Sequence, residues 1–478
     1  MTTDGQRLPR LTSGDGSQRQ GAGRRQYIIA AALVAIVLLG VAARVWHYNA
    51  RDDSQGWGKQ VLDYASIAAN LRDGDGYYES LPEGLRGVSQ PTYVYSWQEV
   101  AALPDGAMER PNAYTLAGYG YFIAGVWTLT GASYVSVQAA QAILDAAVGC
   151  LGLFALLAVA GRPRAGLIAA LGYALAPPLI IQAGLVLPDA LGSAINIGPL
   201  ACVAFGFKTG RVVAGAVAAG LILGAGSWFR GDAVLLVPLL PLAVLALSAY
   251  PLRLRLSWGG AFLAAWVVPT LALALFYQGV YGEFHPTRPG FILLWEGIGQ
   301  QENPWGIAPV EGANLDAAAN RLMRANGFEY GTWQGDAFLR DEALGHMREN
   351  PGWFLKPTLQ RVLRVMTLQK PPEAVSTLPD AVLKATRFAG PVLPLIALAG
   401  VWLLRGSPLV RNLLIAAWLS RVLPFAFLRD ELRFEILLVG IYVACLALVA
   451  DEALRRVEPA LSRLRGLDYE TAPTANLR

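Results

Sequence analysis

The sequence predicts an all-α, polytopic integral membrane protein with about ten transmembrane helices. Of its 478 residues, 54% are hydrophobic and only 15% are charged, whereas a soluble globular domain carries about 25% charged residues. The mean hydropathy is +0.39. Apolar runs of spanning length recur along the chain, and a run of about 20 residues is what a helix needs to cross the hydrocarbon core.

The first run begins at Tyr27 and reads YIIAAALVAIVLLGVAARVW. It is longer than the core of a signal peptide, and no convincing small-residue cleavage pattern follows it, so we interpret it as an uncleaved span. Residues 1–26 are rich in Gly, Ser, Gln and Arg and lack apolar periodicity, which predicts a disordered cytoplasmic tail.

The further expected spans share this length and apolarity. They are residues 133–160, 165–187, 190–207, 212–229, 233–249, 259–280, 389–404, 408–427 and 433–450.

Residues 113–131 form a borderline run, rich in Tyr and Gly, whose placement decides the topology. If this run does not cross, the short loops that carry pairs of basic residues all face the cytoplasm, as the positive-inside rule requires. We therefore predict a re-entrant or juxtamembrane helix there, with both termini in the cytoplasm. The basic residues concerned are Arg162, Arg164, Lys208, Arg211, Arg253, Arg255, Arg405, Arg411, Arg455, Arg456, Arg463 and Arg465.

This topology divides the chain into a membrane core and two large outer segments. The core spans residues 27–280 and includes a first outer loop at 47–132. A second outer loop covers 281–388, and the last transmembrane helices fall in 389–450. Residues 451–478 are the cytoplasmic tail.

Composition also argues against several functions. The net charge is only +4 and the basic residues are scattered, so nucleic acid is not an expected partner. The 3 cysteines lie in apolar stretches, and the 3 histidines show no metal-ligand spacing. No phosphate-binding loop or dinucleotide fingerprint is present, which argues against direct use of a nucleotide sugar. Asp145 is a buried ionisable residue of the second span, a functional candidate unless it pairs with a neighbouring helix.

An amphipathic stretch, WGKQVLDYASIAANLRDGDGYY, occupies residues 57–78 and predicts a juxtamembrane helix just outside the first span. Asp189, Arg230 and Arg433 lie at span ends on the same outer face. Carboxylates and guanidinium groups that converge beside the lipid suit chemistry on a charged lipid substrate.

In these features the sequence resembles the GT-C glycosyltransferases, in particular glycosyltransferase family 39 with its protein-mannosyltransferase and aminoarabinose-transferase branch. The pattern of Tyr64, Ala68, Leu71 and Gly74 in the first outer loop is similar to a motif of these enzymes. Glu109-Arg110-Pro111 ahead of Tyr114, Asp189 after the third span, and Arg433-Phe434 at the start of a late span complete the resemblance. The matching residues are spread from Tyr27 to about Ala450.

The resemblance implies sugar transfer from a polyprenyl-phosphate donor to a glycolipid, polysaccharide or protein acceptor at the outer face of the membrane. It also implies a catalytic carboxylate four residues before Tyr64, where this chain has Gln60. Asp63 and Asp53 are therefore alternative bases that take the proton of the acceptor hydroxyl. Asp189 is the third candidate acid, either catalytic or an N-cap of the following helix.

The departing lipid phosphate gains negative charge, which a fixed cation stabilises. Arg110 is the first candidate for this role, followed by Arg230 and Arg433, and Lys356 is a further candidate in a basic helix of the second outer loop. For contacts with sugar or acceptor, the candidates are Tyr64, Trp295, Glu296 and Trp305.

The sequence leaves two alternatives open for cofactors: none, or a divalent cation held by carboxylates near Asp52, Asp53 and Asp189. The Arg- and Ala-rich composition suggests a bacterial inner membrane protein with a periplasmic or extracellular site. Two other functions remain open, a lipid or solute transporter or flippase, and an inactive GT-C-like scaffold that binds a lipid-linked sugar. An internal repeat would favour the transporter, and none is found.

Overall fold

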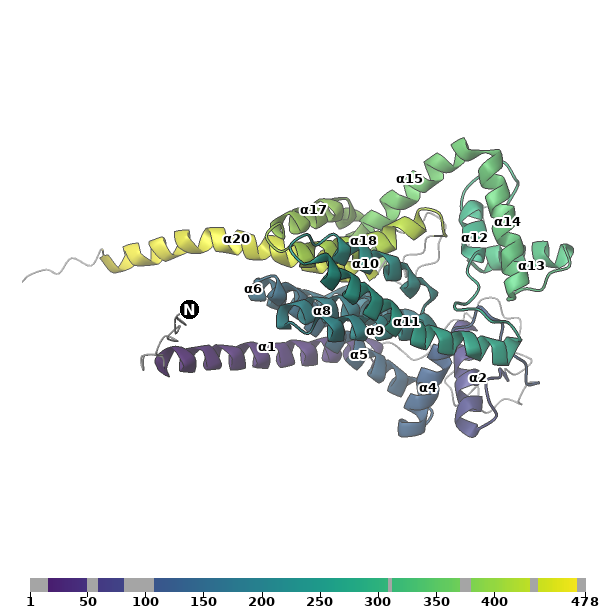
Figure 1. Ribbon diagram of the computed structural model, residues 1–478, viewed down its shortest axis with the longest axis horizontal. Helices are drawn as coiled ribbons and strands as arrows, with labels where there is room; N and C mark the ends of the chain where they lie inside the picture. Colours follow the sequence, from purple (N-terminus) through teal and green to yellow (C-terminus); the bar gives the residue numbers. More distant parts are fainter. Residues whose placement is uncertain are drawn as a thin grey trace, which may run out of the picture.

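The protein is a bundle of helices in its computed structural model, which describes residues 16–49, 59–80, 107–307, 312–369, 380–429 and 437–470 (Figure 1). Among these residues the one extended pairing is a bridge between Glu79 and Glu109. The candidate acids Asp52 and Asp53 and the candidate cation Arg433 lie outside the described residues.

The long axis of the bundle is set by helices that follow the expected spans. They are α1 (Gly16–Asn49), α5 (Tyr134–Val159), α6 (Pro163–Leu175), α7 (Pro177–Ala183), η2 (Pro188–Leu191), α8 (Gly192–Thr209), α9 (Val212–Phe229), η3 (Gly231–Leu235), α10 (Leu236–Leu245), α11 (Leu252–Tyr281), η4 (Gly390–Val392), α17 (Leu393–Leu403), α18 (Pro408–Phe425) and α20 (Leu437–Glu470).

Local sequence explains several of these boundaries. Pro163, Pro177 and Pro408 occupy first-turn positions, where the missing N–H costs no helical hydrogen bond. Gly210 and Gly282 end α8 and α11 with positive φ angles of 72° and 79°.

Five described helices are long and apolar enough to cross a membrane, or six if the pair α6 and α7, bent by 52°, is one span. Every expected span falls wholly or partly on a helix, but the count of about ten is not confirmed by length and composition. One reason is that α10 has 10 residues and α17 has 11. A helix of that size extends about 15 Å, half the hydrocarbon thickness.

The remaining helices gather at one end of the bundle. Here α2 (Lys59–Asp73) and α4 (Ala117–Thr130) run across the direction of α1, and α12 (Ile292–Gly299), α13 (Gly312–Ala325) and α14 (Trp333–Glu349) form a second group (Figure 1). The start of α1 and the end of α20 lie at the opposite end (Figure 1). With only 14 residues, α4 agrees with the prediction of a juxtamembrane helix for 113–131.

Two helices join the second group to the bundle, α15 (Pro351–Thr367) and the short α16 (Asp380–Ala389). Pro357 lies inside α15 without ending it. Arg361 of α15 is buried and donates to the carbonyl oxygens of Gly297, Ala426 and Phe427, at 3.2 Å for Ala426 and 3.1 Å for Phe427. This guanidinium therefore fastens α12 to the end of α18.

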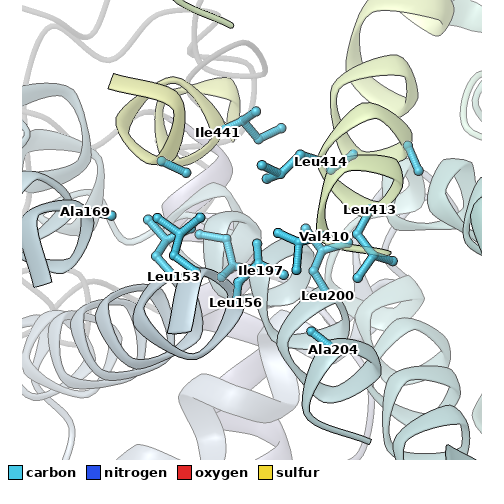
Figure 2. Packing of buried hydrophobic residues seen from close by; sticks show 14 of the residues in the cluster. Leu153, Leu156, Ala169, Ile197, Leu200, Ala204, Val410, Leu413, Leu414 and Ile441 are labelled. Carbon is cyan, nitrogen blue, oxygen red and sulfur yellow. The ribbon is translucent and has the colours of Figure 1, made fainter. Parts of the chain in front are cut away.

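The apolar core of the bundle lies between helices that are distant in sequence. Leu153 and Leu156 of α5 meet Ile197 and Leu200 of α8, with Leu413 of α18 on the far side (Figure 2). The helices α9 and α11 approach closely at Gly220, which has no side chain. A Cβ at this position would lie 2.3 Å from the carbonyl oxygen of Phe262. Small residues four apart allow this backbone contact between membrane helices.

Asp145 pairs with a neighbouring helix. Its carboxylate accepts hydrogen bonds from Arg44 of α1, at 2.8 Å and 3.1 Å, and from the hydroxyl of Tyr173, at 2.7 Å. Arg44 also donates to the carbonyls of Gly40 and Ala174. Since these contacts satisfy both charges, this network holds α1 against α5 and α6.

Candidate functional site

The candidate site is centred on Tyr64, on the face of α2 that packs against α4. Its ring is 6% exposed and meets the ring of Tyr119 edge to face, with centroids 5.0 Å apart. The Tyr64 hydroxyl oxygen accepts a hydrogen bond of 3.5 Å from the backbone N–H of Leu116. Asp63, one residue earlier on α2, is half-buried. Tyr64, which belongs to the motif predicted from the sequence, therefore lies inside the protein.

Three charged residues act on the Tyr64 hydroxyl. Burial raises the pKa of Tyr64 to about 12; the positive charge of Arg288 opposes this rise, whereas the negative charges of Asp189 and Asp63 add to it. The phenol therefore stays neutral at physiological pH. Asp63, Asp189 and Arg288 come from three distant parts of the chain, and the charges of all three act on the Tyr64 hydroxyl.

Asp189 and Arg230 form a buried ion pair beside this point. Asp189 lies in the first turn of η2 and is 7% exposed, and Arg230 follows the last residue of α9 and is 5% exposed. The residue at the N-cap of α8 is Leu191, with no side-chain hydrogen bond. Asp189 therefore does not cap that helix, and its carboxylate contacts the guanidinium of Arg230.

Arg288 is the site residue that the sequence analysis missed. It follows α11 in the linker to α12, and its Nη1 donates a 2.8 Å hydrogen bond to the carbonyl oxygen of Tyr114. A Cβ on Gly231 would lie 3.1 Å from its Nε, so the guanidinium group rests against the residue next to Arg230. Among the described residues no carboxylate forms an ion pair with Arg288. A basic residue in the Thr-Arg-Pro-Gly turn directly after a span was the available signal.

Arg110 is exposed at the edge of this region, next to the bridge between Glu79 and Glu109. Its charge acts on the hydroxyl of Tyr281, at the end of α11. Lys356 is exposed on α15, and no described contact joins it to the Tyr64 site. The roles predicted for both cations stay predictions.

The aromatic stretch of the second outer segment forms a core of its own. Trp295 is 3% exposed, and Glu296, 1% exposed, pairs with Arg429 at 3.0 Å. Neither side chain offers a free surface to a sugar ring in this structure, because Trp295 packs in the core of the α12–α14 group and Glu296 is buried against Arg429. Trp305 is half-buried and stacks on His346, with ring centroids 4.6 Å apart. Its contact with a sugar stays a prediction.

The carboxylates do not form a metal centre within the described residues, where no group of three or more His, Cys, Asp and Glu could hold an ion. Asp189 is engaged with Arg230. Because Asp52 and Asp53 lie outside the described residues, the divalent-cation alternative stays open.

The fold formed by these helices is shared with solved structures of an archaeal oligosaccharyltransferase. No protein-family profile matches the sequence, and no curated protein matches it. Among solved structures, the chain is similar to the archaeal oligosaccharyltransferase AglB from Archaeoglobus fulgidus in complex with an inhibitory peptide and a dolichol-phosphate. The TM-score is 0.54 with 16% identity, over 95% of this chain and 53% of that one.

The apo form of the A. fulgidus oligosaccharyltransferase gives a TM-score of 0.53 with 15% identity, again over 95% of this chain and 53% of that one. A structure of the same enzyme tethered to an acceptor peptide gives 0.50 with 16% identity, over 95% and 52%. The chain thus spans about half the length of the oligosaccharyltransferase. At this identity the similarity shows a shared fold.

Proposed function

We propose that this protein transfers a sugar from a polyprenyl-phosphate-linked donor to a glycolipid, polysaccharide or protein acceptor, at the end of the bundle that carries α2 and α4. The observation that carries this proposal is the convergence of Asp63, the Asp189–Arg230 pair and Arg288 around Tyr64. The A. fulgidus structure with the similar fold holds a dolichol-phosphate, which is also a lipid phosphate.

In this proposal the anomeric carbon–oxygen bond to the phosphate breaks as the acceptor oxygen bonds to the same carbon. The proton of the acceptor hydroxyl passes to a carboxylate, and the phosphate leaves with the bonding electron pair. We propose Asp63 as the base, because it is half-buried on α2 directly beside Tyr64. Asp53 remains the alternative base.

The leaving phosphate needs a cation that is not already neutralised. Arg288 meets this requirement better than Arg230, since no described carboxylate pairs with it. A guanidinium held by one carbonyl keeps further N–H groups for phosphate oxygens, which it binds in paired geometry. Arg110, at the edge, would meet the donor on entry. Tyr64, neutral and buried, would shape the wall of the site.

Sidedness follows from the same proposal. The site lies at the end of the bundle opposite to the start of α1 and the end of α20 (Figure 1). With the termini in the cytoplasm, as the positive-inside rule favours, the site faces the periplasm or the cell exterior of a bacterial inner membrane. Lipid-linked sugars are reached there from the bilayer through the flanks of the bundle.

The test is a single-turnover transfer assay on purified protein with a panel of labelled polyprenyl-phosphate sugars, read as release of polyprenyl phosphate. We expect Asp63→Asn to lower the rate by about 10²–10⁴-fold and Arg288→Ala by about 10²–10³-fold. Asp73→Asn is the matched control, because Asp73 is exposed at the end of the same helix and pairs with the adjacent Arg72.

Two results would change the account. If the wild type consumes no donor but moves the lipid between leaflets, the transporter alternative replaces the transferase. If Asp63→Asn keeps the full rate while Asp53→Asn loses it, the class of reaction survives and the base is Asp53.

A further inference from the structure

A buried carboxylate outside the site, Asp336, holds two segments that meet at Arg288. It lies in the first turn of α14 and is 3% exposed. Its Oδ2 accepts hydrogen bonds from the backbone N–H groups of Gly290 and Phe291, at 2.9 Å and 3.0 Å. Its Oδ1 accepts from the N–H of Ile292 at 2.8 Å and from the hydroxyl of Tyr114 at 3.3 Å. Both oxygens are therefore fully used by donors from other elements.

These contacts form a closed set, called the ring below, that links Asp336, Gly290, Arg288 and Tyr114. Gly290 lies two residues after Arg288, with only Pro289 between them, so the bonds from Asp336 fix the backbone that carries the arginine. Tyr114 supplies the other side, because its hydroxyl binds Asp336 while its carbonyl oxygen accepts from Arg288 Nη1 at 2.8 Å. These contacts thus fix both the backbone next to Arg288 and its guanidinium group.

Such control has an energetic reason. A long arginine side chain loses rotamer freedom when it binds an anion, and prior orientation by fixed groups reduces that loss. A carboxylate that accepts several N–H bonds makes strong, charge-assisted contacts, so the ring is rigid. Its members come from both outer segments, since Tyr114 belongs to the first and Asp336 to the second.

We propose that Asp336 is a positioning residue for anion binding, which through Gly290 and Tyr114 holds Arg288 where the phosphate of a polyprenyl phosphate binds. The inference rests on the proposed function, and it adds that Asp336 is required for donor binding although its carboxylate does not touch the donor.

A double-mutant cycle separates positioning from general stabilisation. The measured quantity is the dissociation constant of an eleven-unit polyprenyl monophosphate in detergent micelles. Asp336→Asn and Arg288→Ala should each weaken binding by about tenfold, a change equal to the loss of roughly one charge-assisted hydrogen bond. The double variant should bind like Arg288→Ala alone, because Asp336 then has no arginine to position. If the loss of affinity in the double variant equals the product of the two single losses, the proposal is overturned. It is also overturned if Asp336→Asn binds as tightly as the wild type.

Two further variants serve as a control and as a replacement for Asp336→Asn. Asp341→Asn is the matched control, since Asp341 lies on the same helix, is exposed and pairs with the adjacent Arg340; it should bind like the wild type. If Asp336→Asn does not fold, Tyr114→Phe replaces it in the cycle. This variant removes one bond of the ring and should weaken binding by about threefold, again only while Arg288 is present.

A second readout does not depend on the proposed function. Phenylglyoxal modifies accessible guanidinium groups, and mass spectrometry can follow the rate at Arg288. If Arg288 is held in place by the ring, Asp336→Asn should raise this rate several-fold, whereas an unchanged rate would overturn the positioning role. Should the wild type bind no polyprenyl phosphate, the proposed function fails while the reaction with phenylglyoxal still decides whether Asp336 positions Arg288.

Discussion

Asp189 and Arg230 form an ion pair at which the start of η2 meets the end of α9, and both side chains are less than one-tenth exposed. Charges at this depth are costly to desolvate, so each depends on its partner. The pair lies beside the residue that Arg288 contacts, Gly231. The guanidinium of Arg230, neutralised by Asp189, therefore lies near that of Arg288, which has no described carboxylate partner.

The first prediction concerns this pair. Arg230→Met should lower the free energy of unfolding by about 3 kcal/mol, because it leaves the Asp189 carboxylate buried without its partner. The double variant Arg230→Met/Asp189→Leu should recover part of the loss, since no charge then remains. Thermal unfolding in detergent measures both. If Asp189→Leu lowers the free energy of unfolding in the Arg230→Met background as much as it does in the wild type, the two residues act independently.

The second prediction tests the packing of α9 on α11. A Cβ at Gly220 would lie 2.3 Å from the carbonyl oxygen of Phe262, so Gly220→Ala should destabilise the protein by about 1–3 kcal/mol. Gly260→Ala, in α11, is the control because nothing lies within 4 Å of its Cβ position. Equal unfolding temperatures for the two variants would contradict the close contact.

The third prediction is a pH dependence. The phenol of an unfolded tyrosine ionises near pH 10, whereas Tyr64 in the folded protein has a pKa of about 12. Between these values the unfolded chain loses this proton first, so the stabilisation is complete below pH 10 and is lost as the pH rises toward 12. We expect wild-type unfolding temperatures to fall more steeply than those of Tyr64→Phe above pH 10. Parallel curves would place Tyr64 in an exposed environment.

The fourth prediction is the membrane topology. In a variant without Cys150, Cys202 and Cys445, a new cysteine at Thr130 should react with an impermeant maleimide applied outside intact spheroplasts. A new cysteine at Arg24 should react only after the membrane is opened. Thr130 is the last residue of α4 and Arg24 lies near the start of α1, and these two parts of the chain are at opposite ends of the bundle (Figure 1). Labelling of Thr130→Cys from the cytoplasmic side alone would reverse the proposed orientation.

Apolar periodicity was enough to predict the helices, because spanning length and composition are local properties of the chain. The helix α4, of 14 residues, falls within the run at 113–131, and its placement at the membrane interface stays a prediction. The predicted count of about ten spans is not confirmed by length and composition, since the break at Pro177 and the short α10 and α17 depart from the regular pattern. Length alone does not tell a broken span from two helices.

Within the site, the sequence pointed to Asp189 and Arg230 through their positions at span ends on one face. It pointed to Asp63 and Tyr64 through the resemblance of the first outer loop to a family motif. It did not point to Arg288 or Asp336, because their importance comes from contacts over 174 and 46 residues of chain separation. Trp295 and Glu296 were predicted at a surface. Aromatic and acidic residues near an interface have the same sequence pattern when they form a small core, as they do here.

The most direct test of the central claim is to locate the lipid phosphate. A polyprenyl phosphate with a photoreactive diazirine on the isoprene unit next to the phosphate should, on illumination, label peptides from α2 and from the Arg288 turn. Excess unlabelled polyprenyl phosphate should suppress this labelling, and Arg288→Ala should reduce it about tenfold. Labelling confined to the end of the bundle that carries the termini, or labelling of the Arg288 turn that survives in Arg288→Ala, would contradict the account.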